Sequence, residues 1–123
     1  SVQFEVRLGD VPRSLEVCAR ARRIIVRTAR GGFALLDRTG RILLTGDGPL
    51  AVDPEDRRAL VVSKGRQILY HLDPLYELRR WPDARYSSPK SVAFSGDGRL
   101  AVVMSVPGAY SVWEIDEGHR VYQ

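Results

Sequence analysis

The chain has 123 residues, of which 44% are hydrophobic and 28% charged, the composition of one globular domain. No apolar run approaches the roughly 20 residues of a membrane-spanning helix, and a lone cysteine, Cys18, excludes an internal disulfide. The net charge is +4, and residues 1–45 are the most basic part, with nine arginines against four acidic residues. We therefore expect a cytoplasmic protein in which Cys18 is a buried structural thiol.

Short apolar runs alternate with Gly, Pro, Asp and Ser along the whole chain. This pattern is typical of short strands joined by tight turns, and no segment supports a long helix. Asp47-Gly48 and Asp97-Gly98 are turn signals, and Pro54-Glu55-Asp56 takes the same role in between. In chain order the predicted strands are 2–8, 14–18, 23–28, 33–37, 41–45, 49–53, 59–63, 67–72, 76–81, 90–95, 99–105, 109–115 and 119–123.

A pattern of strands recurs three times, at intervals of about forty residues. Its clearest copy covers 91–103 and 112–116, and the second covers 50–62 and 70–73. The first copy is looser and runs from Leu15 to Asp37. Such a period predicts an array of similar small units. The third strand of each unit ends in an aspartate, which predicts a shared structural role, such as bonding to turn amides. These aspartates are Asp37, Asp73 and Asp116.

The third unit resembles a WD40-type β-propeller repeat. The resemblance is carried by Val92-Ala93-Phe94-Ser95-Gly96-Asp97-Gly98 and by Val112-Trp113-Glu114-Ile115-Asp116. It implies an all-β fold of four-stranded antiparallel blades around a central channel, about three per chain, with Trp113 packed between blades. The implied domain is a single partial propeller with units of about 14–48, 49–89 and 90–123. Residues 2–8 would form an outer strand of a preceding or partner blade.

Three blades do not close a ring, so the ring is expected to be incomplete within one chain. An open wedge would expose an apolar sheet face and unpaired strand edges, which a soluble protein must cover. We expect another chain to cover them. Two copies closing a six-bladed ring and the remainder of a longer propeller are both consistent with this expectation.

No residue pattern predicts catalysis, a metal or a cofactor. His71 and His119 have no second ligand at metal-binding spacing, and no Gly-x-Ser-x-Gly elbow is present. We therefore expect a protein that is not an enzyme.

Two groups of residues are candidates for binding. Arginines between residues 20 and 30 are either a solvated turn or a site for phosphates or an acidic partner. Trp81 and Tyr86, which follow Arg79-Arg80, suit a protein contact. We predict a non-enzymatic protein–protein interaction scaffold, and the alternative is a nucleic-acid or phosphate-binding module that uses the Arg20–Arg30 cluster. The predicted binding residues are Arg20, Arg22, Arg23, Arg30, Trp81 and Tyr86.

Overall fold

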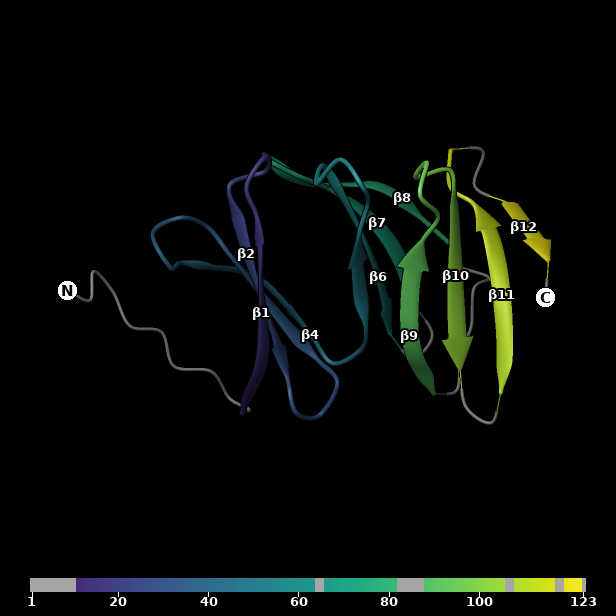
Figure 1. The fold of residues 1–123 in the computed structure, drawn as a ribbon, viewed down its shortest axis with the longest axis horizontal. Coiled ribbons are helices and arrows are strands. Elements are labelled where there is room, and N and C mark those ends of the chain that lie inside the picture. Colours follow the sequence, from purple (N-terminus) through teal and green to yellow (C-terminus); the bar gives the residue numbers. More distant parts are fainter. Residues whose placement is uncertain (1–10, 64–65, 82–87, 106–107, 117–118, 123) are drawn as a thin grey trace.

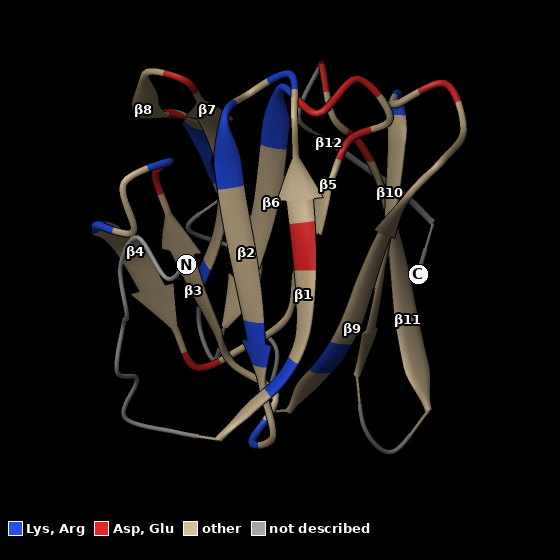
Figure 2. Cartoon of the chain, turned by 60° about the vertical axis from the view of Figure 1, so that its left-hand side comes forward, with Lys and Arg blue, Asp and Glu red and all other residues tan. Residues whose placement is uncertain are grey.

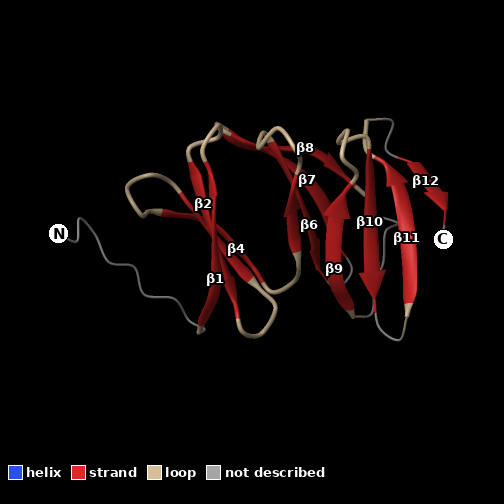
Figure 3. Cartoon of the chain, in the orientation of Figure 1, coloured by secondary structure: helices blue, strands red, loops and turns tan. Residues whose placement is uncertain are grey.

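The computed structural model describes residues 11–63, 66–81, 88–105, 108–116 and 119–122. Within these ranges every regular element is a β-strand (Figure 3). No helix in the described residues is long and apolar enough to cross a bilayer. The strand expected at 2–8 and the predicted contact Tyr86 both lie outside the described residues.

In the described residues, twelve strands form three antiparallel sheets, each made of four consecutive strands (Figure 1). The all-β prediction is confirmed, and each described strand lies within two residues of its predicted bounds. Sheet 1 contains β1 (Pro12–Cys18), β2 (Arg23–Thr28), β3 (Phe33–Leu36) and β4 (Ile42–Gly46). Sheet 2 contains β5 (Leu50–Val52), β6 (Arg58–Ser63), β7 (Arg66–Leu72) and β8 (Leu75–Arg80). Sheet 3 contains β9 (Pro89–Phe94), β10 (Leu100–Ser105), β11 (Ala109–Glu114) and β12 (His119–Tyr122).

The turns between the first two strands of sheets 2 and 3 have the same hydrogen bonds. Asp53 N–H donates to Arg58 O at 2.9 Å, and Ser95 N–H donates to Leu100 O at 2.8 Å. Inside these turns Asp56 has φ +57° and Gly98 has φ +75°. Aspartate tolerates this left-handed conformation better than most side chains do, so Asp56 replaces glycine in the second unit, as the sequence predicted.

The three sheets lie side by side in chain order, and two apolar layers hold them together (Figure 1). Side chains alternate between the two faces of a strand, so β6 contributes to both layers. Ala59 and Val61 face sheet 1, whereas Leu60 and Val62 face sheet 3. The layer between sheets 1 and 2 also contains Cys18, Ile25, Phe33, Leu35, Leu50 and Leu72. The layer between sheets 2 and 3 also contains Leu69, Trp81, Ala101, Val103, Trp113 and Ile115.

The two tryptophans pack against each other in the second layer, with ring centroids 5.9 Å apart. Trp113 lies between two sheets, as predicted. The expectation for Trp81 as a surface contact is wrong, because its side chain is only 4% exposed. Trp81 N–H donates to Gln67 O at 3.0 Å, which continues the β7–β8 pairing by one residue. The alternation of β8 then places the indole on the dry face of the sheet.

Candidate functional site

The predicted arginine cluster is divided between the two ends of sheet 1. Arg20 and Arg22 are exposed in the turn before β2, whereas Arg30 is exposed in the turn after it. A six-residue strand is about 20 Å long, so these side chains do not form one patch. The compact basic surface that a phosphate- or nucleic-acid-binding module would need is therefore not present at these residues.

Arg23, the fourth predicted arginine, connects sheet 1 to sheet 2. Its Nε donates to Leu72 O at 2.8 Å, and its Nη2 lies 3.3 Å from Asp73 Oδ1. The arginine side chain is 11% exposed, so its charge is largely withdrawn from solvent. Arg23 thus has a structural role and is not available for an external ligand.

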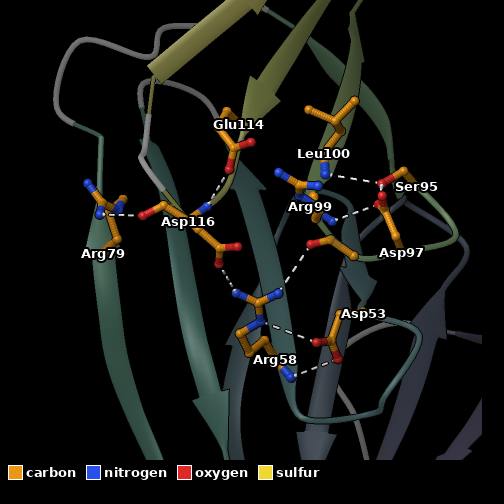
Figure 4. Close-up of polar contacts among 10 residues, drawn as sticks. Asp53, Arg58, Arg79, Ser95, Asp97, Arg99, Leu100, Glu114 and Asp116 are labelled. Atoms are coloured by element: carbon orange, nitrogen blue, oxygen red, sulfur yellow. Dashed lines mark hydrogen bonds and ion pairs between the residues drawn. The ribbon is translucent and has the colours of Figure 1, made fainter.

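Arg58 makes the equivalent connection between sheets 2 and 3 (Figure 4). Its guanidinium donates to Asp116 Oδ1 at 3.0 Å and to Gly98 O at 3.2 Å, both in sheet 3. Within its own sheet it also donates to Asp53 Oδ2 at 3.2 Å. Arg79 Nη2 adds a further bond to Asp116 O at 3.1 Å. These polar contacts therefore join sheets 2 and 3 at one end of the apolar layer between them.

The inter-sheet arginines, Arg23 and Arg58, occupy the same place in their units. Each is the first residue of the second strand and closes a turn of four residues after Cys18 or Asp53. In sheet 3 the same place, after Ser95, is occupied by Leu100. An arginine that bonds to the following sheet is therefore present at this position in sheets 1 and 2, whereas sheet 3 has a leucine there. Sequence reasoning missed this connection because the bonded carboxylates are 50 and 58 residues away.

The recurring aspartates have structural roles, as expected, but in two different ways. Asp37 accepts hydrogen bonds from the N–H groups of Thr39 and Arg41, at 2.9 and 3.0 Å. The hydrogen bond from the Thr39 hydroxyl, helped by these two backbone bonds, lowers the pKa of Asp37. Asp73 and Asp116 instead accept bonds from the arginine of the preceding sheet.

Cys18 is buried, and the His71 ring contacts its own hairpin. Burial, with a smaller contribution from Glu16, raises the pKa of Cys18 to about 12. The raised pKa disfavours the thiolate, which is the reactive form. Cys18 is fully buried, so the prediction of a buried structural thiol is confirmed. His71 Nδ1 is 2.9 Å from Pro74 O, and its ring stacks on Tyr76 at 4.8 Å. Among the described residues no group of three His, Cys, Asp or Glu side chains is placed to hold a metal ion.

A groove of about 610 Å³ lies along the first strands of the three sheets, which we call the inner groove. It is lined by Arg13, Ser14 and Glu16 of β1, Arg27 and Thr28 of β2, Gly31 and Gly32, residues 49–52, and Lys90 to Phe94 of β9. Arg27 is already engaged, since it donates to Glu16 Oε1 at 2.8 Å and to Leu50 O at 2.7 Å. In the described part of the chain, the side chains of Arg13 and Lys90 have no hydrogen-bond or ion-pair partner.

The outward faces of sheets 1 and 3 carry exposed apolar side chains. On sheet 1, Leu15 and Val17 are 66% and 63% exposed, on the face turned away from sheet 2. On sheet 3, Met104 and Tyr110 form a cross-strand pair, 52% and 44% exposed, on the face turned away from sheet 2. We call these the two outer faces. They differ from the inner layers because no sheet in the described residues packs on them.

No protein-family model matches this chain, and no curated protein sequence matches it significantly. Among solved structures, a chain described as "Kuenenia stuttgartiensis Hydrazine Synthase" is similar, with a TM-score of 0.67 over 99% of this chain. The sequence identity is 14%, so the likeness concerns the fold alone. The present chain spans 38% of the length of that chain.

Proposed function

We propose that this chain is a non-enzymatic protein–protein interaction scaffold built from three propeller-type blades of the WD40-like kind. In this proposal each sheet is one blade, and the first strands β1, β5 and β9 line a central channel. The ring is incomplete within one chain. It is completed by another copy, as in a six-bladed dimer, or by the remainder of a longer propeller.

The observation that carries this proposal is the contrast between the inner layers and the outer faces. Each inner layer is dry, as Leu60 and Ile25 illustrate at 0% exposure. The outer faces belong to the same kind of sheet, yet Val17 and Met104 remain more than half exposed. Burying apolar area contributes about 25 cal/mol per Å². Packing a further sheet on an outer face would bury its apolar side chains and so stabilise the assembly. The repeated packing of the three sheets supports the view that a similar sheet would fit.

The mass in solution tests the proposal. We expect the purified chain to associate beyond its monomer mass of 13.8 kDa in sedimentation velocity, with a mass that rises with concentration. The substitutions Leu15→Glu and Met104→Glu should each weaken this association, because a carboxylate would have to be buried in the contact. Both positions are exposed, so the fold itself should survive.

Leu78→Glu is the matched control. Leu78 is 44% exposed on β8, at the edge of sheet 2 and away from both outer faces. The Leu78→Glu substitution should leave the mass in solution unchanged. A folded monomer at all concentrations would contradict the proposal, and so would equal effects of the Leu78 and Met104 substitutions.

A further inference from the structure

The charge of the inner groove is not balanced by its own residues. Three cationic side chains, Arg13, Arg27 and Lys90, line it together with a single carboxylate, that of Glu16. The short ion pair of Arg27 with Glu16 uses that carboxylate. Arg13 and Lys90 are left as two exposed positive charges on the same groove.

The two remaining cations belong to different sheets but lie at corresponding places. Arg13 is the only basic residue of β1 and Lys90 the only one of β9, and each is the second residue of its strand. Figure 2 shows the basic segments of β1 and β9 at the same lower end of the molecule. Both positive charges line one groove, so an anion bound in it is attracted by both.

Neutral donors lie beside these cations. Ser14 and Ser91 follow Arg13 and Lys90 directly, and both line the groove. The strands β1, β5 and β9 are each paired on one side only among the described residues, so one edge of each has backbone N–H groups outside the ladder. A phosphate group has three oxygens that accept hydrogen bonds, and guanidinium, ammonium, hydroxyl and backbone N–H groups are the donors that bind it.

The groove also has an apolar part that suits an organic group. Val92 and Phe94 of β9 line it, and both side chains are partly exposed. Its volume of about 610 Å³ falls in the range of small-ligand sites, about 300–1,000 Å³. Two cations match one phosphate dianion. A nucleic-acid strand would instead need a longer row of positive charges.

We propose that the inner groove binds a small phosphate monoester. In this site the phosphate lies between Arg13 and Lys90, with the hydroxyls of Ser14 and Ser91 as further donors. The organic part of the ligand lies against Val92 and Phe94. This proposal does not require the scaffold function, because all the residues of the site belong to one chain and ligand binding is measured separately from the mass in solution.

The test is a titration of the full chain followed by amide NMR spectra. Three probes are used: inorganic phosphate, adenosine monophosphate and adenosine. We expect saturable shifts in residues 13–16 and 90–94 with the two phosphate probes, stronger with the nucleotide, and none with adenosine. The double variant Arg13→Ala/Lys90→Ala should lower the nucleotide affinity by about tenfold or more.

The charge-matched control is Arg38→Ala/Arg41→Ala, which removes two exposed arginines in the turn before β4. It should leave the affinity within about twofold, because it changes the net charge and not the groove. Three results would overturn the proposal: no saturable binding of either phosphate probe, equal losses in the two double variants, or binding of adenosine as tight as that of the nucleotide. A single-stranded oligonucleotide whose affinity rises with its length would also overturn it, in favour of a polymer. Unfolding midpoints of all variants verify that the fold is intact.

Discussion

Replacing Arg58 with alanine removes the polar connection between sheets 2 and 3 and leaves the apolar layer in place. Arg58 makes side-chain bonds to Asp53, Asp116 and Gly98. Its own side chain is 23% exposed, and its two carboxylate partners differ sharply in exposure. The side chain of Asp53 is 5% exposed and that of Asp116 is 62% exposed.

These exposures determine the expected loss of stability. A bond to a buried charged group contributes about 1.5–3 kcal/mol, whereas an exposed ion pair contributes about 0–1 kcal/mol. Most of the effect should therefore come from Asp53. Asp53 keeps two backbone donors, the N–H groups of Arg57 and Arg58 at 2.8 and 3.0 Å. The loss should thus stay below the roughly 3–5 kcal/mol expected for an unpaired buried charge. We expect Arg58→Ala to lower the free energy of unfolding by about 2–3 kcal/mol.

Urea unfolding followed by tryptophan fluorescence measures this loss. Both tryptophans of the chain lie in the layer between sheets 2 and 3, so the signal reports on the boundary that Arg58 seals. With the slope usual for a small domain, the midpoint should fall by about 1–2 M urea. Arg57→Ala is the control, because the Arg57 side chain is 68% exposed and makes an ion pair only with the exposed Glu55, at 3.6 Å, while its backbone bonds are kept. It should cost less than about 0.5 kcal/mol.

A double-mutant cycle with Asp116→Asn separates the contributions of the two carboxylates. The coupling of Arg58 with Asp116 should be about 0–1 kcal/mol, since Asp116 is exposed. If Arg58→Ala destabilises the protein no more than Arg57→Ala does, the reasoning is refuted. A coupling that accounts for the whole loss would refute it as well, because it would assign the effect to the exposed carboxylate.

Four further predictions concern backbone packing and buried side chains. Gly48→Ala should cost about 1–3 kcal/mol, because the added Cβ would collide with the backbone carbonyl of Val62, whereas Gly96→Ala, with open space around it, should be nearly neutral in the same urea assay. Trp81→Ala should cost about 3–5 kcal/mol, and a fully stable variant would mean that Trp81 is a surface residue after all. Cys18 should react with a thiol reagent at pH 8 no faster than the protein unfolds, and rapid labelling of the native protein would contradict its burial. The folded pKa of Cys18, about 12, is above its ordinary 9.0, so its contribution to stability is complete below pH 9 and is lost as the pH rises toward 12, which urea unfolding across that range measures.

The strands were predictable because their signals are local. The apolar run Leu60-Val61-Val62 predicted a strand buried on both faces, and β6 is packed between two sheets. Asp97-Gly98 predicted a turn, and Gly98 adopts the positive φ that such a turn needs. Each of these features depends on residues within one hairpin, so no knowledge of the tertiary arrangement was needed.

The site was less predictable because its contacts are distant in sequence. Arg20 and Arg30 are ten positions apart, yet a strand separates them in space. Arg13 and Lys90 are 77 positions apart, and only the alignment of β1 with β9 brings both to one groove. Trp81 was predicted to end the strand 76–81 and to form a surface contact, but its backbone bond to Gln67 continues the sheet and its indole packs in the layer between sheets 2 and 3. Charge patterns along the chain do not contain this information.

The leucine that stands where the other two sheets have an arginine gives the stack of sheets a direction. At the first two boundaries a guanidinium fixes the relative position of neighbouring sheets, since it must meet both a carboxylate and a carbonyl group. At Leu100 the third sheet offers no guanidinium to a neighbour, and the exposed face there is mostly apolar, which gives non-directional contact. That junction would therefore accept sheets of varied sequence and small differences in alignment, whereas the two internal junctions each accept one alignment.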